Sequence, residues 1–179
     1  YLVEPPPGGR APDVVVSAND AWALGSSEEG VKVVYRFDGK TWKRVQVAAL
    51  GLKSHPGMGR PKPDFTADRL ERGPKGQPLL LGTRLAWYPG NMAVSRYSLG
   101  VFEWTGSAFQ ERLDLMPAND RTIVEAALSD VDPITYAAGP GGREIVCLDV
   151  HCLARGLPSS FRLEGEEPPV KTKAHGWVY

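Results

Sequence analysis

The sequence contains a strand-turn-strand phrase that occurs twice. The first copy is VVYRFDGKTW at residues 33–42, and the second is VFEWTGSAF at residues 101–109. In each copy a polar residue and a glycine stand at the centre, with aromatic residues on both sides. Asp38-Gly39 is a strong signal for a tight hairpin, because the primed turns need a positive φ that glycine adopts freely. Thr105-Gly106 occupies the same place in the second copy, so the phrase predicts repeated antiparallel hairpins.

Aromatic residues recur in register between the two copies. Such recurrence, at a spacing too long for a helix, indicates repeated units that fill the same kind of core position. The aligned pairs are Trp22 with Trp87, Tyr35 with Phe102, Phe37 with Trp104, and Trp42 with Phe109. A weaker third copy begins with AALSDVDPITYAAG at residues 126–139. The final HGWVY resembles the opening of a further unit. This pattern predicts an all-β chain of antiparallel β-meander repeats.

The distribution of Gly and Pro divides the chain. Residues 1–12 are rich in both and predict a linker or extended lead-in. Residues 13–179 form one predicted β-repeat domain, with units at about 13–47, 79–115 and 126–165. Residues 48–78 have frequent Gly and Pro and no sustained period, which predicts a long irregular loop. A short helix over residues 67–72 is one option within this loop, because Asp68 and Arg72 are four residues apart.

The run SANDAWALG followed by YRFDGKTWKRV resembles the repeat of bacterial secreted or surface β-propeller proteins. Those repeats pair a D-x-W-A-x-G strand with a later F/W-D-G-x-x-W hairpin. The match is close in the first unit, moderate in the second and loose in the third. The resemblance implies propeller-like sheets in a secreted or cell-surface protein that serves as a binding platform.

Two departures limit what the resemblance implies. DGKTW is one residue shorter than the Asp-box of sialidase-type propellers, so no sialidase chemistry is carried over. The unit also fits fewer than three times into 179 residues, whereas closed propellers have at least four blades. The expectation is therefore a piece of a longer propeller, a partial one completed by a partner, or a different β fold with related repeats.

Charge and hydropathy exclude some partners. Lys and Arg total 21, and Asp and Glu also total 21, so the formal net charge is zero. A neutral chain lacks the basic face that nucleic-acid binding needs. No stretch approaches the ~18 apolar residues of a membrane span. The sequence therefore predicts no nucleic-acid partner and no membrane span, and favours a protein partner or a glycan.

Cys147 and Cys152, in the run CLDVHC, are the two cysteines of the chain. Two cysteines so close together are typical of a small disulfide loop in an oxidising compartment, which predicts an extracytoplasmic location. Two reduced, buried thiols are one alternative. A metal site that uses both cysteines with His151 or His175 is another, although the paired C-x-x-C spacing of zinc sites is missing.

Catalytic signatures are missing from the sequence. It has no G-x-S-x-G, H-E-x-x-H, P-loop or G-x-G-x-x-G motif, and its three histidines stand apart. These features favour a chain that is not an enzyme, although they do not decide the matter, and no cofactor or metal is predicted. We expect a non-enzymatic binding or scaffold domain that mediates protein-protein interaction. The alternatives are a glycan-binding or glycan-active propeller and a structural subunit completed by a partner chain.

Binding residues are expected where polar and aromatic side chains leave the clean strand alternation, since loops on a rigid sheet usually carry recognition. One group comes from the second unit and its connection, and the other from the loop 48–78. The candidates are Tyr88, Asn91, Arg96, Tyr97, Trp104, His55 and Arg60.

Overall fold

The computed structural model describes most of the chain, and its regular elements are almost entirely β-strands. The described residues are 6, 11–53, 62–86, 96–117, 124–125, 134–148 and 151–157. Among them the strands form three antiparallel sheets of four or five strands and a small two-stranded one, and no barrel closes. Two single-turn 3-10 helices, η1 (Ala48–Leu50) and η3 (Pro140–Gly142), are the helical elements of this part. The all-β prediction is confirmed.

Sheet 1 is the four-stranded meander that the first unit predicts. Its strands are β1 (Val14–Ser17), β2 (Asp20–Ser26), β3 (Lys32–Phe37) and β4 (Trp42–Val45), paired in that order. Gly39 in the β3–β4 turn has φ +91°, and the Asp38 amide donates to the Thr41 carbonyl at 3.2 Å. The Asp38 carboxylate accepts from the amides of Lys40 and Thr41, which closes the turn. The predicted hairpin is confirmed.

Sheet 2 repeats this meander. Its strands are β10 (Phe109–Glu111), β9 (Arg96–Trp104), β8 (Pro78–Ala86) and β7 (Phe65–Arg72), with β12 (Val124–Glu125) also paired to β9. Gly106 has φ +99°, and the Thr105 amide donates to the Ala108 carbonyl at 3.0 Å. Trp104 lies opposite Phe109 as Phe37 lies opposite Trp42. The two copies of the phrase therefore form the same hairpin.

One aromatic alignment is wrong. Arg36, one residue before Phe37, lies opposite Trp22, whereas Glu103, one residue before Trp104, lies opposite Leu79. By strand register, Leu79 is therefore the residue of sheet 2 that is equivalent to Trp22 of sheet 1. Trp87, which the sequence spacing aligned with Trp22, lies outside the described residues. Spacing along the chain misleads here because the connections within the two hairpins differ in length.

The segment 48–78 is not irregular throughout, and the helix considered over residues 67–72 is wrong. β7 occupies Phe65–Arg72, and β5 (Leu52–Lys53) pairs with β6 (Lys62–Pro63). The β7–β8 register shifts between Ala67 and Arg69, which marks a β-bulge. The bulge inserts an extra residue, so the buried positions no longer alternate strictly. That shift hides the strand from a pattern search.

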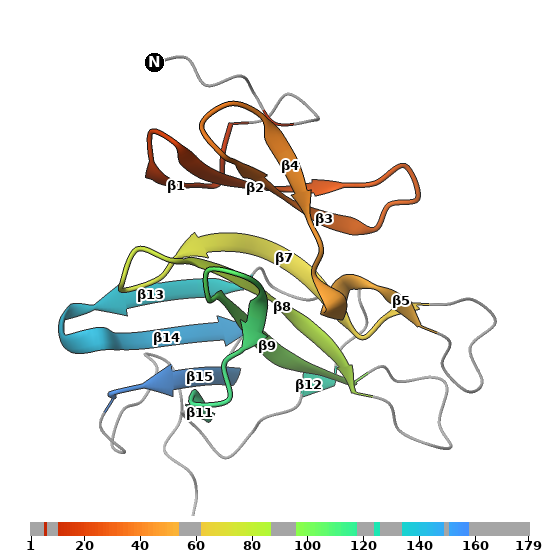
Figure 1. Cartoon of the computed structure of the whole chain (residues 1–179). Coiled ribbons are helices and arrows are strands. Elements are labelled where there is room, and N and C mark those ends of the chain that lie inside the picture. The colour runs from red at the N-terminus through yellow and green to blue at the C-terminus, as the bar shows by residue number, and fades with distance from the viewer. Residues whose placement is uncertain are drawn as a thin grey trace, which may run out of the picture.

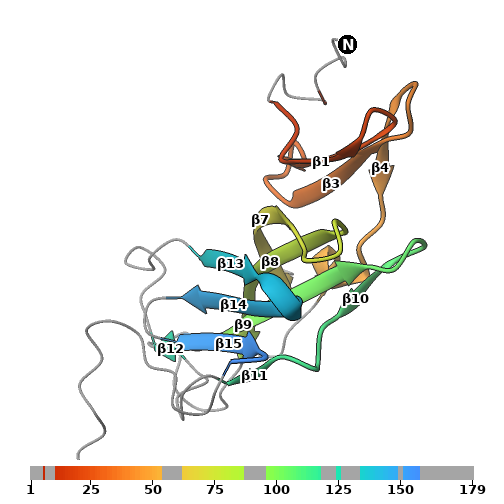
Figure 2. The ribbon, with the colours of Figure 1, turned by 90° about the vertical axis from the view of Figure 1, so that its left-hand side faces the viewer.

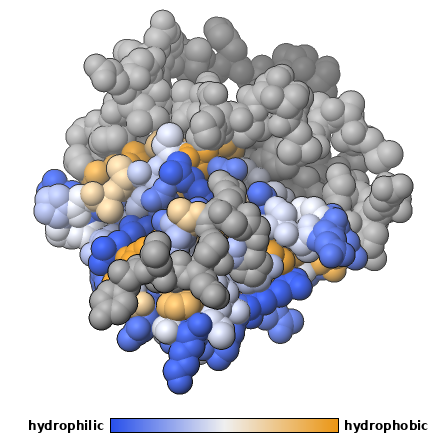
Figure 3. All heavy atoms as spheres, turned by 90° about the horizontal axis from the view of Figure 1, so that it is seen from above, coloured by the Kyte–Doolittle hydropathy of each residue, from blue (hydrophilic) through white to orange (hydrophobic). Residues whose placement is uncertain are grey.

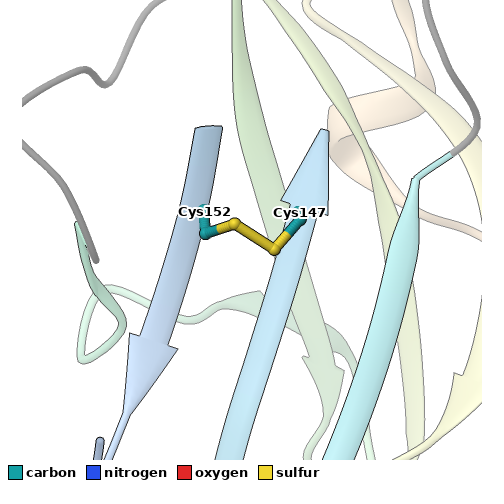
Figure 4. The surroundings of a disulfide bond; sticks show 2 residues. All are labelled: Cys147 and Cys152. Atoms are coloured by element: carbon teal, nitrogen blue, oxygen red, sulfur yellow. A yellow bond between two sulfur atoms is a disulfide. The ribbon is translucent and has the colours of Figure 1, made fainter. Parts of the chain in front are cut away.

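Sheet 3 contains the disulfide. Its strands are β11 (Met116–Pro117), β15 (His151–Arg155), β14 (Arg143–Leu148) and β13 (Thr135–Gly139), in that order across the sheet. Cys147 on β14 lies directly opposite Cys152 on β15, and their sulfurs are bonded (Figure 4). Both side chains are buried, at 8% and 3% exposure. The predicted disulfide is confirmed, and it joins the two strands of one hairpin.

The disulfide leads to a stability prediction. Its loop spans five positions of sequence separation, and closing so short a loop in the unfolded chain contributes on the order of 2 kcal/mol. We expect reduction to lower the free energy of unfolding by about that amount while the strands remain folded. Urea unfolding with and without reductant, followed by circular dichroism, measures this. Complete loss of the β-sheet spectrum on reduction without urea would contradict it.

The three sheets pack face to face, with sheet 2 in the middle (Figures 1 and 2). A first buried cluster fills the space between sheets 1 and 2, and a second fills the space between sheets 2 and 3. Leu79, Leu80 and Leu81 on β8 are each 0% exposed. Leu80 belongs to the first cluster, while Leu79 and Leu81 belong to the second. Sheet 2 is therefore buried on both faces.

Two glycines shape the first cluster. Phe65 is 0% exposed, and its ring lies against Gly82 of β8 and Gly100 of β9. A Cβ on Gly82 would lie 2.6 Å from this ring and 2.1 Å from the Thr66 carbonyl oxygen. A Cβ on Gly100 would lie 2.8 Å from the ring. The glycines thus leave the room that Phe65 fills.

Candidate binding site at the turn end of the sheets

Turns from all three sheets lie at one end of the stack, which we call the turn end. They are residues 38–41, 73–77, 105–108 and 140–142. The turns at 73–77 and 140–142 are seen at the left of Figure 1. Side chains beside these turns connect neighbouring sheets: Trp22 reaches Trp104, and Arg112 reaches Glu144. The turn end therefore combines contributions from segments far apart in the sequence.

An aromatic cluster joins sheets 1 and 2 at the turn end. The ring centroid of Trp22 lies 4.8 Å from that of Trp104 and 5.6 Å from that of Phe109, with tilted and edge-on planes. Such geometries are favourable for aromatic pairs beyond the area that they bury. Trp22 is 0% exposed, whereas Trp104 and Phe109 are half-buried. Trp104 thus packs in the core and also reaches its edge.

Arg36 lies over this cluster. Its guanidinium carbon is 5.2 Å from the ring centroid of Trp22 and 5.7 Å from that of Trp104, distances at which a cation is attracted to the ring face. Asp20 accepts two hydrogen bonds from the guanidinium, at 2.9 and 3.2 Å. The Arg36 side chain remains 37% exposed. A cation is thereby held in one orientation at the surface, beside a half-buried tryptophan.

A second cluster, of charged groups, joins sheets 2 and 3. The Arg112 side chain is 8% exposed and forms a two-bonded pair with Asp114, at 2.6 and 2.8 Å. Its Nη2 also donates to Glu144 at 3.1 Å, and its Nη1 lies 2.8 Å from the Glu103 carboxylate, outside hydrogen-bond geometry. The hydrogen bond to Asp114, and then that to Glu144, raise the pKa of Arg112 further. Arg112 is therefore the centre of the cluster.

Glu144 is the buried acid of this cluster, at 3% exposure. Arg155 Nη2 lies 2.8 Å from its carboxylate, and the Tyr136 hydroxyl donates to it at 3.2 Å. Burial first, and then the charge of Glu144, raise the pKa of Tyr136, so the phenol remains a donor. A buried carboxylate needs hydrogen-bond donors or positive charges around it, and Glu144 has both. The cluster acts as a tie between sheets.

Asp114 makes the tie sensitive to acid. The hydrogen bond from Arg112 lowers its pKa to about 2. A carboxyl group whose pKa is lower in the folded than in the unfolded chain stabilises the folded state. This stabilisation is fully present above the pKa of the unfolded chain, about 3.9, and is lost as the pH falls toward 2. We expect Asp114→Asn to remove this part of the pH dependence. Urea midpoints between pH 2 and 5 measure it, and parallel curves for the two proteins would contradict it.

The residues predicted for binding do not all meet. Trp104 ends β9 at the turn end, whereas Arg96 and Tyr97 begin β9 and pair with β12. Trp104 is eight positions beyond Arg96 along the extended strand, a distance of about 26 Å. The structure therefore places Trp104 at the opposite end of the strand from those two. The remaining candidates lie outside the described residues: His55, Arg60, Tyr88 and Asn91.

Sequence reasoning missed the charged cluster and Arg36. The members of the charged cluster come from β9, β14, β15 and the segment after β10, so no local pattern connects them. Glu144 alone carries a signal, because it shares its strand face with Val146 and Leu148, which are both buried. A charged residue on the buried face of a strand needs partners. That signal predicts a buried ion pair without naming the arginines.

The described residues offer little for metal chemistry. They contain no group of three or more His, Cys, Asp or Glu side chains that could hold a metal ion. Both cysteine sulfurs are in the disulfide, so neither is a thiolate ligand in this state. The alternatives of free thiols and of a cysteine metal site do not describe this structure.

Comparison with known proteins gives no relative from which to assign a family. No protein-family model matches the chain, and no curated protein or solved structure matches it significantly. Within the described ranges, no helix is long and apolar enough to cross a membrane. The turn end, with Trp104 and Arg36 held by the core at its edge, is the best-supported candidate binding site.

Proposed function

We propose that this chain is a non-enzymatic binding or scaffold domain that contacts a protein partner at the turn end. The observation that carries this proposal is the pair of Arg36 and Trp104, held in fixed orientation by Asp20 and Trp22. Arginine and tryptophan are enriched among the residues that dominate protein interfaces. Side chains that are already ordered lose less entropy on binding. A rigid three-sheet stack supplies that order.

The experiment compares two arginines of sheet 1. Arg36→Ala removes the oriented cation, and Arg44→Ala removes an exposed arginine from the other face of the same sheet. We expect proteins captured from the extracellular fraction of the producing cells to be lost with Arg36→Ala and retained with Arg44→Ala. Equal capture by the wild type and both variants, or equal loss from both variants, would count against the turn end as the binding site.

The stack also supports a β-propeller-like architecture as part of the proposal. In propellers, successive antiparallel sheets of four strands pack face to face. Sheets 1 to 3 pack in this way here, and β12 adds a fifth strand to the four-stranded meander of sheet 2. The part of the chain that the structure describes forms three such sheets, fewer than a closed propeller needs, so we propose a partial or incomplete propeller. The intact mass of the protein as its source makes it tests this. A mass well above 19.5 kDa would place these sheets in a longer propeller.

An extracytoplasmic location is the third part of the proposal. Its support is the Cys147–Cys152 disulfide, since such bonds persist in oxidising compartments and are rare in the cytosol. Alkylation of the native protein under non-reducing conditions, followed by mass measurement, tests it. Two alkylated cysteines in the protein as isolated from its source would remove this support.

The glycan-binding alternative rests on Trp104, whose half-buried ring could stack on the apolar face of a sugar. A panel of polysaccharides added while tryptophan emission is recorded separates it from the protein-binding proposal. A shift that disappears in Trp104→Phe would favour the glycan reading.

A further inference from the structure

β13 is an edge strand of sheet 3. Among the described strands it is paired with β14 alone, and Figure 2 shows it at one edge of the sheet, with β14 and β15 following. Its register with β14 is unbroken over five residues, from Thr135 to Gly139. The free side of an edge strand presents backbone amides and carbonyls with which another strand can pair. β13 is therefore a candidate surface for strand addition.

The other edges of the three large sheets carry features that discourage pairing. β1 and β7 contain register shifts, which bend a strand and disrupt its ladder. β4 and β10 carry charged residues, and β11 carries a proline: Lys43, Arg44, Glu111 and Pro117. Seen from above sheet 1, hydrophilic side chains gather at the edges of the coloured surface (Figure 3). β13 has no charged residue, no proline and no register shift.

The side chains of β13 are open to solvent on both faces of sheet 3. Ala137 and Ala138 are both exposed, and consecutive residues of a strand point to opposite faces. Ala138 is exposed although it shares its face with Tyr136, which packs against the cluster between sheets 2 and 3. This part of β13 is therefore accessible from both faces, as an incoming strand requires.

The pairing of β14 with β15 shows which backbone groups of β13 point outward. Opposite residues of antiparallel strands alternate between hydrogen-bonded pairs, with Cα atoms about 5.5 Å apart, and non-hydrogen-bonded pairs, about 4.5 Å apart. The Cα atoms of Cys147 and Cys152 are 4.1 Å apart, so this pair is of the second kind. The amide and carbonyl of Cys147 therefore point away from β15, toward Thr135 of β13.

The outward groups of β13 are those of Tyr136 and Ala138, because the backbone direction alternates along a strand. A contact from β7 agrees with this direction. Arg69 Nη1 donates at 2.7 Å to the carbonyl of Ile134, which is two residues before Tyr136 and so on the same edge. Within the described part of the chain, no group is hydrogen-bonded to the amide or carbonyl of Tyr136 or Ala138 on this edge. Two amides and two carbonyls are thus left for an incoming strand.

We propose that β13 pairs with β13 of a second copy of this chain, antiparallel and across a two-fold axis at Ala137. In this register Tyr136 of each copy lies opposite Ala138 of the other, so all the outward amides and carbonyls form hydrogen bonds. The two copies of sheet 3 become one continuous sheet, and the contact closes at two copies. It uses neither Arg36 nor Trp104, so it goes beyond the binding site at the turn end and does not depend on it.

The residues of β13 suit pairing with a second copy of the same strand. Like charges directly opposite each other destabilise a sheet, and β13 carries none. The pair on the axis consists of two alanines, which need little room. A shift of the register by two residues would place Ile134, whose carbonyl is already bonded, opposite Ala138. The opposite shift would place Pro140, which has no amide, opposite Tyr136. The register centred on Ala137 is the one that pairs every outward group.

Cysteine cross-linking in the full chain tests the register. Ala137→Cys places two thiols across the axis in a non-hydrogen-bonded pair, the arrangement that Cys147 and Cys152 have within one chain. Ala138→Cys is the matched control, because its two thiols lie diagonally across the axis, too far apart for a disulfide. We expect air oxidation to give a covalent dimer with Ala137→Cys only, and mass spectrometry of unreduced peptides to locate the bond. Equal yields from the two variants, or no dimer from Ala137→Cys, would overturn the proposal.

Sedimentation velocity over a range of concentrations tests the edge without a new disulfide. One short edge is a small contact beside the standard interface of about 1,600 Å², so we expect a wild-type dimer that dissociates on dilution. Ala138→Pro removes an outward amide from each copy and leaves the bonds to β14 in place. Ala137→Lys sets two like charges opposite each other. Both variants should be monomeric at millimolar concentration, with the circular dichroism of the wild type.

Ala137→Ser is the matched control for the lysine variant and should dimerise as the wild type does, because serine is small and uncharged. A wild type that is monomeric at millimolar concentration would overturn the proposal. A dimer that survives both Ala138→Pro and Ala137→Lys would also overturn it, since the two copies would then meet at another surface.

Discussion

Replacing Glu144 by alanine is expected to lower the free energy of unfolding by about 3 kcal/mol. The carboxylate is 3% exposed and accepts from Arg112 and Tyr136, with Arg155 at 2.8 Å. Its removal leaves the positive charge of Arg112, whose side chain is 8% exposed, with one carboxylate fewer to balance it. Water reaches this place poorly and cannot replace the lost partner. Asp114 and Glu103 still face Arg112, which limits the loss. Urea unfolding at pH 7 measures the change.

Two further variants show whether charge is the cause. Glu144→Gln keeps the size of the side chain and loses its charge. We therefore expect its free energy of unfolding to lie between those of the wild type and Glu144→Ala. Glu28→Gln changes an exposed glutamate in the turn between β2 and β3, and is expected to have no effect on the unfolding midpoint. If Glu144→Gln were as stable as the wild type, packing and not charge would hold sheets 2 and 3 together here.

Replacing Gly82 by alanine is expected to destabilise the chain by about 3 kcal/mol. The added Cβ would lie 2.1 Å from the Thr66 carbonyl oxygen. This is far inside van der Waals contact, so the backbone would have to shift. It would also lie 2.6 Å from the Phe65 ring, which is 0% exposed and packed in the cluster between sheets 1 and 2. β7 would therefore have to move away from β8. Thermal and urea unfolding both measure the loss.

Gly139 is the matched control for this substitution. It also lies in a strand, its φ is −122°, and a Cβ there would meet the Arg143 Cβ at 3.7 Å, an ordinary contact. Alanine at this position lowers the conformational entropy of the unfolded chain. It should therefore leave the free energy of unfolding unchanged or raise it by about 0.5 kcal/mol. Equal destabilisation by Gly82→Ala and Gly139→Ala would show that the loss comes from glycine's flexibility and not from crowding against Phe65.

The sequence predicts the fold best where structure is local. The hairpins at Gly39 and Gly106 follow from turn chemistry, and the aromatic pairs beside them follow from the repeated phrase. The pattern fails where tertiary packing changes the period. Leu79 to Leu81 are consecutive because both faces of sheet 2 are buried, and a strand of that kind has no alternation. The bulge in β7 moves the buried positions to Phe65, Ala67 and Leu70, a spacing that suits neither a regular strand nor a helix.

The candidate site was less predictable from the sequence than the fold. Trp104 stands out as an aromatic residue at a strand end, but nothing in the sequence pairs it with Trp22, 82 positions earlier. Arg36 alternates with Tyr35 and Phe37 on β3 and looks like an ordinary solvent-facing residue until sheet 2 is packed beneath it. Arg112 follows a short edge strand, and its partners lie on other sheets. Such sites depend on which faces of the sheets meet, and local patterns carry no information about that.

The burial of sheet 2 on both faces also decides how the molecule opens. β8 is hydrogen-bonded to β7 on one side and β9 on the other, with a sheet above and a sheet below. Its amide protons can reach solvent only when the entire stack comes apart. The edge strands β1 and β13 can release theirs by local opening. Hydrogen exchange followed by mass spectrometry should therefore show β8 as the slowest segment, and early exchange there would contradict this order.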